Sequence, residues 1–396
     1  MGTNLEMGGY DTELKRIVEE LNRTATPSAP PAPRQQSAPR LREVPASLDQ
    51  LLSLAARRNA SDVLLVAGSP VAMRVGGLLT PSAGPSLTSE EVGSLVLPLL
   101  EASQYEELQR AKSVDFSFVR ESVGRFRANI HHQRGTLAAS IRVLPTKTPT
   151  LESLHLPPTL ARIAERRQGL VLVTGPTGCG KSSTQAAIID LINSRRCDHI
   201  VTIEDPIEYQ HTNRTAIIEQ IEVGHDTPDF VNSLRSILRQ NPDVIQVGEM
   251  RDAETMATVL SAAETGHLVL STLHTNDTSQ AVSRILDSFP AANQPQIRQQ
   301  LSLALLAVVA QQLVPAADGV SRYPALEIMT ATDAVRNLIR RGEDHQLRSQ
   351  ISISRTEGMI TMEQSLAELV RTGKILRETA FAHCFRLDDL RRHLEA

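Results

Sequence analysis

The sequence predicts an α/β fold in which a parallel sheet, covered by helices on both faces, follows a smaller α+β domain. From about Leu160, short apolar runs such as LVLVTG and HLVLSTLH alternate with helical segments, which is typical of buried parallel strands. Further upstream, VDFSFV (residues 114–119) alternates apolar and polar residues, as half-buried antiparallel strands do. A glycine-rich loop joins the first apolar run to a helix, an arrangement typical of phosphate-binding domains.

The composition is that of a globular protein with room for two domains. The chain has 396 residues, 41% of them hydrophobic, and a formal net charge of -4. This small charge and the few aromatic residues argue against a nucleic-acid partner. The three cysteines form no CxxC pair, which argues against a disulfide framework or an all-cysteine zinc site. The most apolar run, Leu301 to Ala310, covers only half of the roughly 20 residues that span a bilayer, so we expect any membrane association to be peripheral.

Changes in composition divide the chain into three parts. Residues 1–46 are rich in proline and alanine and are expected to form a disordered leader, with a short helix over residues 11–22. Residues 47–150 are expected to form the first domain, and residues 151–396 the second domain with its C-terminal helices.

Local signals predict where several elements begin. Ser47 precedes a helix with leucines at helical spacing, and Thr88 to Glu91 fit a capping box. In the second domain, helices are expected from Lys181 and Pro228, between strands. After Ala316 the strand pattern weakens, so the remainder is expected to be mainly helical.

The strongest local motif fits the P-loop pattern G-x-x-x-x-G-K-[ST]. Its residues, with the serine that follows, are Gly175, Pro176, Thr177, Gly178, Cys179, Gly180, Lys181, Ser182 and Ser183. Backbone N–H groups of such a loop and the start of the following helix bind phosphates. Lys181 is expected to reach the β- and γ-phosphates, and Ser182 to bind Mg²⁺. The sequence therefore predicts a site for ATP and Mg²⁺.

Acidic residues flank two of the later strands. DVIQVGEMRD contains Asp243 and Glu249, and HIVTIEDPIEY contains Glu204 and Glu208. Either cluster alone could be a solvated strand end. Because both follow the P-loop at the spacing of strands, we expect them to bind Mg²⁺ or to orient the attacking water.

A histidine and three arginines complete the candidate site. His274 ends an apolar strand and is expected to sense the γ-phosphate, whereas a role for His267 is left open. Arg125, Arg127 and Arg142 alternate with apolar residues on strands of the first domain. Each could be a surface arginine, or could stabilise the charge of the transition state.

Four segments in order resemble the Walker A, Asp, Walker B and His boxes of the secretion ATPase superfamily, which drives type II secretion and type IV pili. They are GPTGCGKSS, IVTIEDPIEY, PDVIQVGEMRD and TGHLVLSTLHTND. The resemblance runs from about Ser47 to the C-terminal helices, and is greatest to the PilT-like retraction branch. No four-cysteine insertion follows the His box, and AVRNLIR (334–340) is similar to the AIRNLIR motif of that branch.

The resemblance implies a PAS-like N-terminal domain, a RecA-like ATPase domain and a homo-hexamer with ATP between the two domains. It implies that Asp243, with Ser182, belongs to the metal site and that Glu249 completes the Walker B box. Glu208 is expected to polarise water, with Glu204 as the competitor for that role. His274 is expected to sense the γ-phosphate, and Arg127 and Arg142 to be the arginines that the N-terminal domain brings to the site. Cys179 stands where the family often has serine, and could make the loop sensitive to thiol oxidation.

The implied function is a motor that hydrolyses ATP to retract type IV pili during twitching motility. The implied location is the cytoplasm, peripherally at the inner membrane, where a platform protein would be the direct partner and pilin an indirect one. Two alternatives stay open: a related motor for pilus extension or type II secretion, and a weakly hydrolysing regulatory subunit.

Overall fold

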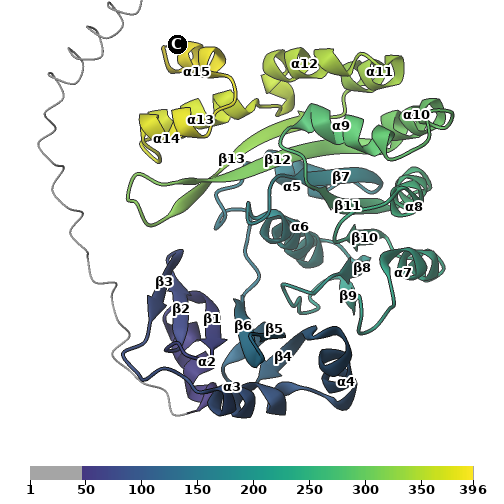
Figure 1. Cartoon of the computed structure of the whole chain (residues 1–396). Coiled ribbons are helices and arrows are strands. Elements are labelled where there is room, and N and C mark those ends of the chain that lie inside the picture. Colours follow the sequence, from purple (N-terminus) through teal and green to yellow (C-terminus); the bar gives the residue numbers. More distant parts are fainter. Residues whose placement is uncertain (1–46, 396) are drawn as a thin grey trace, which may run out of the picture.

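The computed structural model describes residues 47–395. The predicted leader, with its short helix, lies outside the described residues, as does Ala396. Within the described part, a six-stranded sheet precedes a seven-stranded sheet, and the smaller domain lies beside the β9 edge of the larger sheet (Figure 1). The predicted class, an α/β fold preceded by a small α+β domain, is confirmed.

The N-terminal domain is an antiparallel sheet with helices on one face. Its strands are β1 (Ala60–Val66), β2 (Ala72–Val75), β3 (Leu78–Pro81), β4 (Ser113–Arg120), β5 (Gly124–Gln133) and β6 (Thr136–Leu144), in the order β3-β2-β1-β6-β5-β4. The helices are α2 (Leu48–Arg57), α3 (Ser89–Val96), the short η1 (Leu97–Leu99) and α4 (Ala102–Ala111). The predicted cap at Ser47 and the capping box at Thr88 are both present.

The two faces of this first sheet differ in chemistry. Phe126 and Ile130 of β5 are fully buried against the helices. Because side chains alternate along a strand, Arg125 and Arg127 lie on the opposite face, and Arg142 of β6 stands directly across from Arg127. This polar face therefore carries all three candidate arginines.

The larger sheet is parallel except at one edge. Its strands are β7 (Gly169–Thr174), β8 (His199–Glu204), β9 (Ile217–Glu222), β10 (Val244–Val247), β11 (Leu268–Leu273), β12 (Leu305–Pro315) and β13 (Arg322–Thr330), in the order β13-β12-β7-β11-β10-β8-β9. Only β13 runs antiparallel to its neighbour, β12. In such a sheet the carboxyl ends of the parallel strands meet at one edge, where ligands usually bind.

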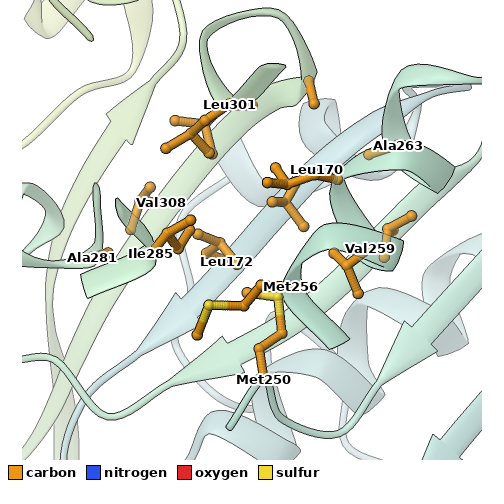
Figure 2. Close-up of a cluster of buried hydrophobic side chains, with 14 of the residues drawn as sticks. Leu170, Leu172, Met250, Met256, Val259, Ala263, Ala281, Ile285, Leu301 and Val308 are labelled. Atoms are coloured by element: carbon orange, nitrogen blue, oxygen red, sulfur yellow. The ribbon is translucent and has the colours of Figure 1, made fainter. Parts of the chain in front are cut away.

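Helices cover both faces of the larger sheet. One face packs on α7 (Phe230–Ile237), α8 (Ala253–Glu264), α9 (Thr278–Asp287) and α10 (Gln294–Ala304), and the other on α5 (Thr159–Ala164) and α6 (Lys181–Arg195). Along β7, Leu170 and Leu172 face the first group, as Figure 2 shows, whereas Val171 faces the second. Burial on both faces explains why these strands are continuous apolar runs.

The C-terminal part differs from its prediction in one respect. It is helical from α11 (Asp333–Arg341) through η2 (Asp344–Gln346), α12 (Leu347–Ile353), η3 (Arg355–Glu357), α13 (Met362–Arg371), α14 (Arg377–Ala382) and α15 (Leu387–Glu395). However, β13 lies within the stretch expected to be mainly helical. It was missed because its pairing with β12, and not an alternating pattern, stabilises it. Six of its nine positions are buried, and Glu327 interrupts its apolar run.

One smaller prediction is also corrected. The helix expected from Pro228 begins at Phe230, because the side chain of Asp229 caps it. The apolar run Leu301 to Ala310 is divided between the end of α10 and the start of β12. Within residues 47–395, no helix combines the length and the apolar character that a bilayer crossing requires.

Candidate active site

The P-loop lies between β7 and α6, at the carboxyl edge of the larger sheet. Gly175 (φ 143°) and Gly180 (φ 93°) adopt backbone angles that favour glycine. A Cβ on Gly175 would lie 2.2 Å from the carbonyl oxygen of Gln311, and one on Gly180 would lie 2.8 Å from the Gln311 amide nitrogen. Gly175 is therefore required by the close approach of the β12 backbone as well as by its backbone angles, and Gly180 chiefly by its backbone angles.

Gln311 of β12 supports the loop from behind. Its side-chain nitrogen donates to the carbonyl oxygen of Cys179 (2.7 Å), and its side-chain oxygen accepts from the hydroxyl of Thr184 (2.8 Å). The residue is buried, so both bonds are protected from water. Sequence motifs did not identify Gln311, because its contacts join positions more than 120 residues apart.

Lys181 and the following serines begin helix α6. The ammonium of Lys181 donates to the carbonyl oxygens of Gly175 (2.8 Å) and Pro176 (3.2 Å), so it lies over the ring of the loop. The first N–H groups of a helix have no partner within the helix and attract phosphate. The hydroxyl of Ser183 is 2.7 Å from that of Tyr209. This bond links the P-loop helix to the segment that carries Glu208.

Cys179 is less reactive than its place in the loop suggests. It is only 3% exposed, and burial raises the pKa of its thiol despite the nearby charge of Lys181. Because the thiolate is the form that oxidants attack, burial opposes the oxidation sensitivity that the sequence suggested. Cys197, by contrast, is exposed.

Glu249 and His274 meet at the carboxyl ends of the parallel strands, where the P-loop also lies. Glu249 follows β10 and His274 follows β11, and their side chains approach to 3.4 Å. Partial burial alone would raise the pKa of Glu249, but the hydrogen bonds and charges of Arg251 and His274 together lower it. Glu249 is therefore ionised at neutral pH, at the edge where the phosphates of a nucleotide would lie.

Asp243 lies at the wrong end of its strand to bind the metal. It precedes β10, and its carboxylate accepts from the backbone N–H of His199 at the start of β8 (2.8 Å). The parallel register aligns Val244 with Gly169, the first residue of β7, through Leu268 of β11. Six residues of β7 thus separate Asp243 from the P-loop, or about 20 Å at ~3.3 Å per residue. The predicted metal role of Asp243 is therefore wrong.

The two glutamates proposed to activate water occupy different surroundings. Glu204 ends β8, is 9% exposed, and accepts hydrogen bonds from Thr202 (2.7 Å) and Gln220 (3.2 Å). Burial is the main reason that its pKa is raised, and the charge of Glu208 adds to the effect. Glu208 lies in the following loop, half-buried, and no hydrogen bond or ion pair within the described residues engages its carboxylate.

The raised pKa of Glu204 leads to a pH-dependent stability. At a pH below the ordinary pKa of 4.5, the carboxyl is protonated in both the folded and the unfolded chain, so its titration does not change the free energy of unfolding. Above it, the unfolded chain releases the proton first, so ionisation of the buried group destabilises the fold increasingly as pH rises. We expect Glu204→Gln to raise the thermal unfolding midpoint at pH 8, and the gain to shrink toward pH 5.

The measurement is a series of thermal unfolding curves between pH 5 and pH 8. Glu106→Gln is the matched control, because Glu106 is an exposed residue of α4. A gain for Glu204→Gln that stays constant over this range, or a loss at pH 8, would contradict the expected cost of ionising Glu204.

The candidate arginines do not reach the P-loop within one chain. Arg127 pairs with Asp115 (3.8 Å) and Arg142 with Asp62 (3.1 Å), both inside the N-terminal domain. The arginine that contacts the larger domain is Arg125, which the sequence considered but did not select. His267 lies at the amino end of β11 and hydrogen-bonds the carbonyl oxygen of Ala262 (2.9 Å), which accounts for it structurally.

A charged network joins the histidine-bearing loop to the C-terminal helices. Glu327 of β13 accepts from the N–H (3.0 Å) and the hydroxyl (2.7 Å) of Thr278 at the start of α9. Arg348 lies 4.0 Å from Glu327 and bridges to Glu363 (2.9 Å) and Asp389 (2.6 Å). A cavity of about 850 Å³, whose lining contains no P-loop residue, is lined in part by Glu327, Arg348, Glu363 and Asp389.

The oxygen donors at the P-loop edge fit Mg²⁺ bound together with a nucleotide. No hydrogen bond within residues 47–395 occupies the side chain of Ser182, the second residue of α6. The carboxylate of Glu249 stands at the same edge of the sheet. In the described part, no group of three or more acidic, histidine or cysteine residues could by itself hold a metal ion.

Comparisons with known proteins agree with this arrangement. A family model described as type II/IV secretion system protein matches residues 132–380. The chain is 40% identical to the type IV pilus ATPase PilU of Pseudomonas aeruginosa over 343 residues, covering 87% of this chain and 90% of PilU. It is 41% identical to the type IV pilus retraction ATPase PilT of the same organism, covering 84% of this chain and 96% of PilT.

A solved structure gives the same result in three dimensions. The crystal structure of the pilus retraction motor PilT with bound ADP superposes with a TM-score of 0.82 at 42% identity. It covers 88% of this chain and 100% of the PilT chain. The similarity therefore includes the N-terminal domain as well as the P-loop domain.

Proposed function

Since the chain belongs to the type II/IV secretion system protein family and is a PilT-like type IV pilus ATPase within it, we propose that it is a hexameric motor that retracts type IV pili. The chain binds nucleotide and hydrolyses ATP. The observation that carries the proposed motor is the contact between the N-terminal domain and the segment before Glu208, because a site whose parts come from two domains can convert hydrolysis into domain movement.

The proposed roles in hydrolysis follow the carboxyl edge of the sheet. Backbone N–H groups of the P-loop and the ammonium of Lys181 bind the phosphates. Ser182 and Glu249 would hold Mg²⁺, which would neutralise charge on the phosphates. Glu208 orients the attacking water, which its free carboxylate supports, while His274 senses the γ-phosphate beside Glu249.

Arg127 and Arg142 are proposed to reach the nucleotide of a neighbouring subunit. Their position on the open polar face of the first sheet supports this, because neither is buried against its own P-loop. In a closed ring each such face would meet an equivalent surface of the next copy. Their charges would then stabilise the transition state only when two subunits close together.

Retraction, as opposed to extension or secretion, is supported by two features of the C-terminal half. The hairpin of β12 and β13 contains no cysteine, whereas extension and secretion ATPases usually carry a four-cysteine zinc insertion after the His box. In addition, α11 contains the AVRNLIR segment. We place the working protein in the cytoplasm at the inner membrane, with a pilus platform protein as its direct partner and pilin as an indirect one.

The two arginines of AVRNLIR have different surroundings, and this gives a test of the retraction role. Arg336 donates to the carbonyl oxygens of Ala331, Ser302 and Leu303, two of them at the end of α10. It therefore holds α10 and α11 together. Arg340 is exposed, and no carboxylate within the described residues pairs with it.

We expect Arg340→Ala to abolish pilus retraction in cells while ATP turnover of the purified chain stays within about twofold. Arg336→Ala is the structural comparison, and its lost charged hydrogen bonds are expected to lower stability by about 2 kcal/mol. The measurements are a twitching assay, steady-state turnover and thermal unfolding. Full twitching with Arg340→Ala would remove α11 as support for the retraction role.

A regulatory subunit that assists another motor is the second candidate, and the similarity to PilU favours it. The two candidates differ in cells that lack every other retraction ATPase. A retraction motor restores twitching when it is the only such protein present. An accessory subunit restores it only beside a second motor, although its own ATP turnover can be intact.

A further inference from the structure

Arg125 joins the N-terminal domain to the ATPase domain through a nearly buried ion pair. Its guanidinium lies 2.9 Å from one carboxylate oxygen of Glu222, and the two side chains are only 11% and 14% exposed. The other oxygen of Glu222 accepts from the hydroxyl of Ser117 on β4 (2.9 Å). The N-terminal domain therefore engages both oxygens of this carboxylate at the end of β9.

The same pair holds the backbone of Ile207, in the loop after β8, through both its N–H and its carbonyl group. The backbone N–H of Ile207 donates to Glu222 (3.1 Å), and its carbonyl oxygen accepts from Arg125. Glu222 is itself fixed, because its own N–H donates to Asp226 (2.9 Å). Ile207 thus has little freedom to move, and the next residue in the chain is Glu208.

We propose that Arg125 is a positioning residue for ATP hydrolysis, which acts through Ile207 to place the carboxylate of Glu208. This inference rests on the proposed role of Glu208 as the group that orients water. A displacement of about 1 Å in a reacting group can lower the rate about 100-fold. Because Arg125 belongs to the N-terminal domain, Glu208 is correctly placed only when that domain is docked.

The bond to Ile207 distinguishes this role from simple attachment of one domain to the other. Attachment requires only the ion pair with Glu222, whereas the second bond reaches the backbone directly before Glu208. Arg127 and Arg142, on the same face of the sheet, pair instead with carboxylates of their own domain. Of the three arginines, Arg125 is thus the one whose guanidinium contacts the segment next to Glu208 within a single chain.

The test replaces Arg125 by glutamine and by lysine. We expect Arg125→Gln to lower kcat about 10- to 100-fold, while KM for ATP, affinity for a fluorescent ADP analogue and assembly state stay within about threefold. Arg125→Lys keeps the charge but cannot make both bonds, so its kcat is expected to lie between those of glutamine and arginine. Arg120→Gln is the matched control, because Arg120 pairs with Asp49 inside the N-terminal domain.

A double variant separates positioning from attachment. In single-turnover reactions, Arg125→Gln is expected to cause little further loss when added to Glu208→Gln, since both act on one group. The positioning role would be overturned if the losses of rate from the two changes were fully additive, or if assembly and thermal stability fell in parallel with kcat. It would also be overturned if Arg125→Gln kept its full kcat while Glu208→Gln was inactive. If Glu208→Gln itself keeps full turnover, the proposed role of Glu208 fails first.

Discussion

Lys181→Ala is expected to reduce ATP turnover about 100- to 1000-fold, the size of effect seen when one preorganised donor to the transition state is removed. The ammonium of Lys181 already lies over the loop, bonded to the carbonyl oxygens of Gly175 and Pro176. Alanine removes both the positive charge that faces the phosphates and these two bonds. The fold is expected to survive, because the change removes only these two hydrogen bonds, each worth about 1.5–3 kcal/mol for a charged donor.

The measurement is steady-state release of phosphate by the purified chain, with circular dichroism and thermal unfolding as tests of folding. Lys147→Ala is the matched control, because Lys147 is an exposed loop residue outside the P-loop. Turnover by the folded Lys181 variant at the rate of the control would show that hydrolysis in the preparation does not come from this P-loop.

Glu208→Gln is expected to lower kcat about 100- to 10,000-fold, the range for loss of a positioned acid or base, and to leave nucleotide affinity nearly unchanged. Glutamine keeps the size of the side chain but cannot take a proton from water. Glu204→Gln should have a smaller effect, because the amide oxygen of glutamine can still accept the bonds from Thr202 and Gln220. The variant with the larger loss of kcat therefore identifies the group that orients water.

Turnover should be measured over a range of protein concentrations, with assembly followed by light scattering. Turnover per chain that rises with hexamer formation, and is lost in assembled Glu208→Gln, is the expected result. A larger loss in Glu204→Gln than in Glu208→Gln would transfer the role to Glu204. Turnover that is independent of assembly would contradict a site completed by a neighbouring subunit.

The P-loop was predictable because its requirements are local. Three glycines, Lys181 and Ser182 occur at fixed spacing between a buried strand and a helix, and each residue type has a steric or charge reason to be there. The class of the fold was predictable for a similar reason. Continuous apolar strands between helices can be buried only in a sheet that is covered on both faces.

The position of Asp243 could not be predicted from the residues around it in the sequence. The sequence places acids before and after the strand 244–247, and either end can look suitable for a metal. Only the direction of the strand in the assembled sheet decides between them. Because β10 is parallel to β7, Glu249 lies at the edge with the P-loop and Asp243 at the opposite edge.

The supporting residues were not predictable, because they act across long separations in the chain. Gln311 contacts Cys179 and Thr184 only after β12 has paired with β7. Arg125 and Glu222 meet only after two domains have docked. Neither glutamine nor an isolated ion pair forms part of a recognisable motif, so a three-dimensional structure was needed to find them.

The network around Arg348 has a practical consequence for labelling this protein. Asp389 of α15 bonds Arg348, which lies 4.0 Å from Glu327, the carboxylate that accepts hydrogen bonds from Thr278 at the start of α9. A fluorescent fusion or an affinity tag placed directly after α15 would therefore be attached close to a structural connection with the nucleotide site. Imaging and pull-down work should place such additions in an exposed loop of the N-terminal domain, for example at Gly76 and Gly77.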